Sequence, residues 1–215
     1  MRSWEVMPQK VEPIAEVISS SITGVVAQCL MSLDNDGMPD TSKPRFGSFL
    51  KIRTASNFDV LAVVHNVITG SPDAIHQPWA LGLSREQLRE EQPHIFSLLR
   101  TEVHAVVVGY MENGEVYQHL PPIPPEVHDF VFPADDDEIR KVTQGFDFLR
   151  LIATVTTVPQ DELAAASIRE AHKAHSQDYS FLVEAGQALS HIFKNDFDRL
   201  VTILRKIRPS SSARS

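Results

Sequence analysis

The chain has 215 residues, of which 42% are hydrophobic, and its formal net charge is −8. A chain of this length and composition can bury a substantial core, in one large or two small domains, without disulfides. Residues 1–133 carry 9 Lys and Arg against 16 Asp and Glu, a net charge of −7, which argues against direct binding to nucleic-acid phosphates.

The first half of the chain is typical of an antiparallel β-protein, because Val- and Ile-rich runs alternate with turn residues. Asn113 and Gly114 form a strong hairpin signal, so the strands on either side should pair and set Tyr110 opposite Tyr117. Short strands at near-regular spacing indicate a small closed or nearly closed barrel. The predicted strands are 22–30, 46–53, 60–68, 103–111 and 115–120.

Two further features divide the barrel region. Ser84, followed three residues later by Gln87, forms a capping-box pattern and predicts a short helix between the third and fourth strands. The four prolines within 121–125 fix φ and remove backbone donors, so strand pairing should give way to an extended connector. We therefore place the end of the barrel domain at residue 133.

After Pro133 the pattern becomes helical. The acids at 135–138 occupy a predicted first turn, where exposed amides and the helix dipole favour negative charge. An apolar run at 146–158, an alanine-rich helix that opens at Pro159 and a helix capped by Asp178 follow. The predicted fold class is α+β, a small antiparallel β-barrel followed by a C-terminal helical region. The predicted divisions are 1–133 for the barrel domain, 134–209 for the helices and 210–215 for a disordered tail.

The last helix should be amphipathic. Asn195 can cap it, and apolar residues recur after it at three- and four-residue steps. We expect this stripe to be buried on the preceding helices or against another copy. The candidate interaction surface consists of Phe197, Leu200, Leu204 and Ile207.

Sequence signatures of catalysis are missing. No G-x-x-x-x-G-K-[ST] loop for phosphate and no G-x-S-x-G nucleophile elbow occur. Residues 34–37 suggest a calcium loop, but Met38 and Pro39 stand where an oxygen ligand and a glycine are needed, which favours a plain turn. We assign no catalytic, cofactor-binding or metal-binding residue, and the sequence favours a non-catalytic protein.

The histidines leave one alternative open. His172 and His175 are spaced to share a helix face, but no zinc signature surrounds them, so a solvated face is the preferred interpretation. A small-molecule enzyme or sensor with a pocket between barrel and helices is the alternative function, in which His65, His94 or His104 could act.

The cellular setting is expected from what the sequence lacks. Cys29 is the single cysteine and cannot form an internal disulfide, and no secretory leader precedes the first strand. No apolar run reaches the roughly 18 residues that span a bilayer. These features predict a soluble cytoplasmic protein without membrane contact.

Several short segments carry a family resemblance. They are Gly24-Val25-Val26, Phe46-Gly47-Ser48-Phe49-Leu50-Lys51-Ile52, Val60-Leu61-Ala62-Val63-Val64-His65-Asn66-Val67 and the connector 121–137. Over roughly residues 18–140 the chain resembles the HAS-barrel family, the N-terminal barrel shared by HerA-type DNA-translocating ATPases and the ATP synthase catalytic ring. Those ATPases continue into a P-loop domain, whereas this chain continues into helices, so no ATPase activity or catalytic residue is carried over.

The resemblance implies an assembly role. The leading prediction is a non-catalytic binding or assembly module in which the helices provide an oligomer or partner surface, so a protein partner or self-association is expected. An accessory role in nucleic-acid processing is implied by the family alone.

Overall fold

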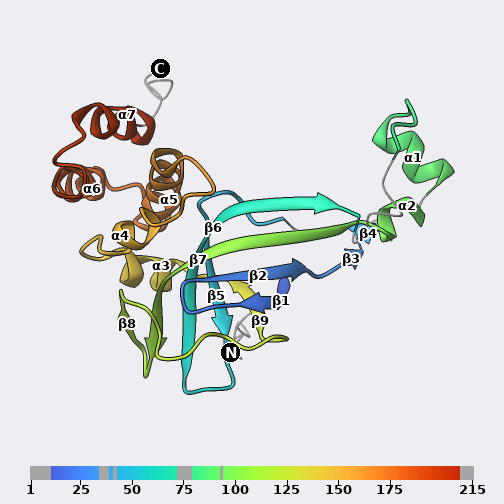
Figure 1. Ribbon diagram of the computed structural model, residues 1–215, viewed down its shortest axis with the longest axis horizontal. Helices are drawn as coiled ribbons and strands as arrows, with labels where there is room; N and C mark the ends of the chain where they lie inside the picture. Colours follow the sequence, from blue (N-terminus) through green and yellow to red (C-terminus); the bar gives the residue numbers. More distant parts are fainter. Residues whose placement is uncertain (1–10, 34–38, 41–42, 72–78, 93, 209–215) are drawn as a thin grey trace, which may run out of the picture.

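The computed structural model describes residues 11–33, 39–40, 43–71, 79–92 and 94–208. Its N-terminal part is a closed six-stranded antiparallel β-barrel, and helices follow it, so the predicted α+β fold class is confirmed (Figure 1). The ring runs in the order β2-β1-β9-β5-β6-β7 and closes through a β2–β7 pairing. The loop 34–37 and the tail 210–215, on which two predictions were made, lie outside the described residues.

The described elements follow the chain in this order. The strands are β1 (Ala15–Ser20), β2 (Gly24–Cys29), β3 (Ser32–Leu33), β4 (Pro39–Asp40), β5 (Phe49–Arg53), β6 (Phe58–Gly70), β7 (Arg100–Glu112), β8 (Glu115–Tyr117) and β9 (Phe130–Pro133). The helices are α1 (Arg85–Glu91), α2 (His94–Ser97), α3 (Asp136–Thr143), α4 (Phe148–Ile152), α5 (Gln160–Ala174), α6 (Tyr179–Ile192) and α7 (Phe197–Ile207).

The barrel contains two strands that the sequence patterns did not predict. β1 pairs with β2, and β9 inserts between β1 and β5 to complete the wall. The predicted hairpin is confirmed, since Asn113 and Gly114 have φ of 52° and 83° and Tyr110 pairs with Tyr117. The two tyrosine rings stack with their centroids 5.0 Å apart.

Two hydrophobic cores lie on opposite sides of the barrel wall. Along β6, Val60, Ala62 and Val64 face the core inside the barrel, while Leu61 and Val63 belong to a core shared with the helices. β5 and β7 likewise contribute to both cores. The boundary at residue 133 stays a prediction, but the outer core contains residues from both sides of it.

A long arm extends away from the helical region. β6 and β7 continue to pair with each other as far as Gly70 and Arg100, beyond the parts that pair with β5 and β2, and Figure 1 shows α1 and α2 past this end. The predicted capping box is confirmed, because Ser84 accepts from the amide of Gln87 and the Gln87 side chain accepts from the amide of Ser84. α1 contains no buried residue, so this helix adds nothing to either core.

The helical region begins with the predicted acidic cap. Asp135 and Glu138 form a capping box at the start of α3. At α7 the prediction was wrong by one residue: Asp196 caps the helix by accepting from the amide of Arg199 at 3.1 Å, in place of Asn195. A carboxylate at this position also has a favourable interaction with the helix dipole. Within the described chain, every helix is too short or too polar to cross a membrane.

Candidate functional site

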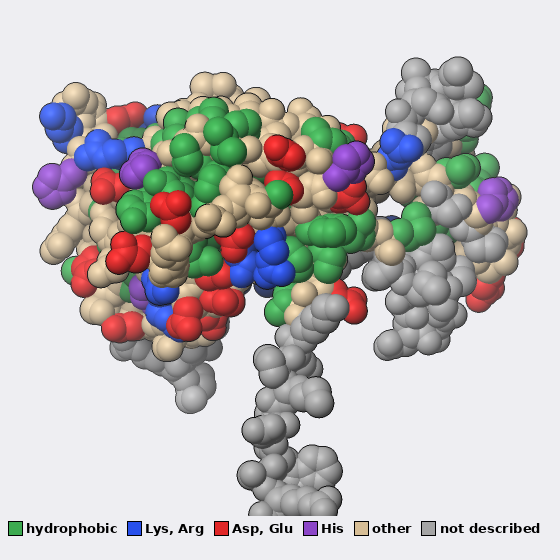
Figure 2. Space-filling model, turned by 90° about the horizontal axis from the view of Figure 1, so that it is seen from below, with side chains coloured by type: hydrophobic (Ala, Val, Ile, Leu, Met, Phe, Trp, Pro, Cys, Tyr) green, Lys and Arg blue, Asp and Glu red, His purple; other side chains and the backbone are tan. Residues whose placement is uncertain are grey.

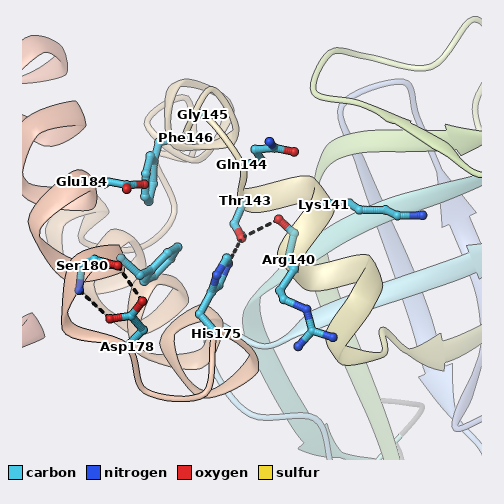
Figure 3. Close-up of a pocket in the computed structure, with 11 residues that line it drawn as sticks. Arg140, Lys141, Thr143, Gln144, Gly145, Phe146, His175, Asp178, Ser180 and Glu184 are labelled. Atoms are coloured by element: carbon cyan, nitrogen blue, oxygen red, sulfur yellow. Dashed lines mark hydrogen bonds between the residues drawn. The ribbon is translucent and has the colours of Figure 1, made fainter.

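One hollow of the described structure is a cleft among the helices. It has a volume of ≈ 370 Å³ and lies between the end of α3, the turn after it, the end of α5 and the start of α6 (Figure 3). The lining includes Thr143, Phe146, His175, Phe181 and Glu184. The predicted alternative had placed a pocket between barrel and helices, whereas this cleft belongs to the helices.

His175 is held firmly at the edge of this cleft. Its ring stacks on Phe181 with centroids 4.1 Å apart, and its Nε2 lies 3.0 Å from the hydroxyl oxygen of Thr143. That hydroxyl donates its hydrogen to the carbonyl of Ile139 at 2.7 Å, so His175 Nε2 is the donor in the imidazole–hydroxyl bond. Burial, with a smaller contribution from Arg140, lowers the pKa of His175 and favours the neutral ring.

Three charged groups of the cleft are engaged in structural contacts. Arg140 donates to the carbonyl of Ala174 and pairs with Asp137, and Lys141 donates to the carbonyl of Gly114 at 2.9 Å. Asp178 caps α6 through hydrogen bonds from Ser180, which lower the pKa of this carboxyl.

His172 and His175 do not form the solvated face that their spacing predicted. Both rings stack on Phe181, with centroid separations of 6.3 Å for His172 and 4.1 Å for His175. Aromatic stacking, which spacing along one helix does not reveal, keeps both rings half-buried. Within the described ranges, no group of three or more His, Cys, Asp or Glu side chains is arranged to hold a metal ion.

A second hollow, of ≈ 210 Å³, lies on the barrel wall beside the β1–β2 turn. It brings together His65 of β6 and His104 of β7, whose ring centroids are 6.2 Å apart. His94 belongs to α2 at the end of the arm, away from this hollow (Figure 1). Two of the three histidines proposed from the sequence therefore meet, although they are 39 positions apart in the chain.

Comparison with known families addresses the barrel. Residues 14–113, from the start of β1 to the β7–β8 turn, match the family model of the HAS barrel domain. The N-terminal part of the chain is a HAS barrel domain. No curated protein matches the chain.

A glycine fixes where the helices meet the HAS barrel. Gly47 has φ of +83°, and a Cβ atom there would lie 2.6 Å from the Cβ of Ala166 in α5. Only a residue without a side chain permits this backbone contact. The motif that carries the family resemblance therefore includes the point of contact with α5.

The HAS barrel has one wall that the helices leave bare. Three large apolar side chains are exposed here: Ile18 of β1 is 41% exposed, Phe130 of β9 is 48% exposed, and Val127, in the connector before β9, is 51% exposed. Their backbone segments lie side by side, because Glu16 pairs with Phe130 and the amide of His128 donates to the carbonyl of Val17 at 2.9 Å. This bare wall was not predicted from the sequence.

The predicted surface on α7 is largely used inside the chain. Ile207 is buried, and Leu200 and Leu204 are partly buried against the core shared with α5 and α6. Phe197, by contrast, is 73% exposed, while Ile203, which the prediction did not include, is fully buried. Whether these four residues contact a partner stays a prediction, for which Phe197 is the accessible position.

Proposed function

We propose that this protein is a non-catalytic binding or assembly module that contacts a protein partner, or a second copy, through the bare wall of its HAS barrel. In this proposal the helices cover β5, β6 and β7 and leave β1 and β9 for the contact. The single observation that carries it is the cluster of exposed Ile18, Val127 and Phe130. Large apolar side chains that share one open surface are typical of protein interfaces.

The surroundings of this wall suit an interface. Glu16 pairs with His128 beside the apolar cluster, and the Arg53 guanidinium lies over the Phe132 ring at 4.6 Å from its centroid. An apolar centre with a charged rim is the usual anatomy of a protein interface. On the face drawn in Figure 2, basic side chains lie beside acidic ones and form no separate basic patch, which also favours a protein over a nucleic acid.

The test compares two exposed phenylalanines. We would measure solution mass over a range of concentrations, and capture from native extract, for the wild type, Phe130→Asp and Phe197→Asp. The proposal predicts that Phe130→Asp abolishes association or capture while keeping the wild-type melting curve. The proposal would be contradicted if Phe130→Asp associates as the wild type does. It would also be contradicted if association is lost in Phe197→Asp alone, a result that would favour α7 as the contact surface.

The cleft in Figure 3 supports a second candidate function, a small-molecule sensor. Its Phe181 ring and polar rim suit a small ligand with an apolar part. A metabolite screen by thermal shift tests this, because a ligand that binds the folded state raises the melting temperature. A stabilising compound whose effect disappears in Thr143→Val would favour the sensor; no stabilising compound in the screen would favour the assembly module.

A further inference from the structure

One side of α7 faces away from the core and combines apolar with basic residues. Four residues, at steps of four, four and three positions, share this side of the helix: Phe197, Val201, Arg205 and Arg208. Ile203, which is fully buried, lies on the opposite side and holds α7 on the core. Phe197 is largely exposed, so this side offers an apolar anchor beside two arginines.

α7 and the residues around it carry an excess of positive charge. Residues 194–208 contain five Lys and Arg against two Asp. Lys206 pairs with Asp161 of α5 and so fastens α7 to the helical region. Arg205 and Arg208 are exposed, and neither has an acidic partner among the described residues. Their charges are therefore open to a group outside the chain.

The bare wall of the HAS barrel has the opposite charge. Residues 11–33 and 118–133, which include β1, β2 and β9, contain four Asp and Glu and no Lys or Arg. Strand register places Glu16 beside Phe130, and Glu126 is exposed in the connector before β9. The exposed apolar side chains of this wall are therefore bordered by carboxylates.

The two surfaces complement each other but cannot meet within one chain. Figure 1 shows α7 beyond α5, away from β1 and β9, and its buried Ile203 keeps it there. Arg53 of β5, the basic residue that pairs with Phe130, already lies over the Phe132 ring. Apolar centres with rims of opposite charge are the pattern of two surfaces that bind each other. A second copy of the chain supplies the missing surface.

We propose that α7 of one copy docks on the bare wall of a second copy, so that the chain associates head to tail. This docking rests on the proposed function and names the occupant of that wall. Phe197 enters the apolar cluster around Phe130, and the two exposed arginines of α7 lie beside the carboxylates of the wall. Because the contacting surfaces differ, each dimer keeps one free wall and one free α7, and larger oligomers form as the concentration rises.

Mixing two variants that each lack one surface tests the head-to-tail contact. Analytical ultracentrifugation should show the wild type gaining mass with concentration, whereas Phe130→Asp and Phe197→Asp, both at exposed positions, should each stay monomeric. An equimolar mixture of the two variants should form a dimer and nothing larger, because one supplies an intact wall and the other an intact α7. The control is Tyr179→Asp, which replaces another exposed aromatic side chain outside the contact and should associate as the wild type does.

Three results would overturn the head-to-tail contact: a wild type that stays monomeric, Phe197→Asp that associates as the wild type does, or no dimer in the mixture. The first two leave the proposed function standing where Phe130→Asp still loses capture from native extract or self-association, since the wall would then bind another protein or an identical wall. Association of Phe130→Asp at the wild-type level would contradict both.

The charges are tested by reversing them. Arg205→Glu/Arg208→Glu should weaken association at least about tenfold, because like charges would then meet at the wall. Added NaCl should weaken association of the wild type, since salt screens exposed charges. Equal association by this double variant and the wild type at every salt concentration would overturn the proposal.

Discussion

Replacing Glu138 by alanine should strongly destabilise the junction between barrel and helices. Glu138 is 6% exposed, pairs with Lys51 of β5 and accepts from the amide of Asp135 at 2.9 Å. Removing one partner of a buried ion pair typically costs about 3–5 kcal/mol, because the remaining charge is left without compensation. For a chain of this size each kcal/mol lowers the melting temperature by about 2–4 °C.

Urea denaturation monitored by circular dichroism would measure this loss against two controls. Asp137→Ala removes a pair with Arg140 whose side chains are 79% and 41% exposed, so it should cost less than about 1 kcal/mol. The double change Lys51→Met/Glu138→Leu removes both charges and should recover most of the stability lost in Glu138→Ala. If Glu138→Ala is no less stable than Asp137→Ala, the buried pair does not hold the junction and the reasoning fails.

Four further outcomes are expected. Ile203→Ala should lower the free energy of unfolding by about 2–5 kcal/mol because the residue is fully buried, while Phe197→Ala, 73% exposed, should match the wild type in the same denaturation assay. The pKa of folded His175 lies below its unfolded value of about 6.5, so the unfolded chain binds more protons as the pH falls through 6.5. Stability should therefore fall as the pH drops through about 6.5, and it should fall less in His175→Gln. Equal shifts of the urea midpoint in both proteins would refute this. Burial raises the pKa of the Cys29 thiol to about 11, so a thiol reagent such as DTNB should react at an appreciable rate only after denaturant is added. Duplex DNA should bind weakly and without sequence preference, and nanomolar affinity by fluorescence anisotropy at physiological salt would contradict the acidic-barrel argument.

Three of the predicted strands, β5, β6 and β7, are buried on both faces. β5, β6 and β7 lie between the inner core and the helices, so their sequences are nearly continuous apolar runs. β1 and β9 are covered on the inner face alone, and each has a weaker pattern: Glu16 and two serines in β1, and a terminal proline in β9. Their pairing also joins residues more than 100 positions apart, which no local pattern reveals.

Helix starts were easier to predict than sites, for a physical reason. A cap depends on residues within three positions, as with Asp135 and Glu138, so the sequence contains the whole interaction. The pairing of His65 with His104 depends instead on a bulge and on strand register. The spacing of His172 and His175 was visible, but their stacking on Phe181 of the next helix was not.

The contact at Gly47 explains why the two parts of the chain cannot be treated as separate modules. The position needs glycine for its left-handed backbone, and also because a Cβ there would lie 2.6 Å from the Cβ of Ala166 and 2.8 Å from the amide nitrogen of Ser167, both in α5. Its own amide donates to the carbonyl of Val64 at 2.8 Å, so the same residue joins the barrel ladder to α5. α5 in turn is buried without interruption from Leu163 to Ile168, between the barrel and the later helices. A shift of α5 would therefore disturb β5 and β6, and for this reason our proposal places the partner on the wall formed by β1 and β9, away from the helices.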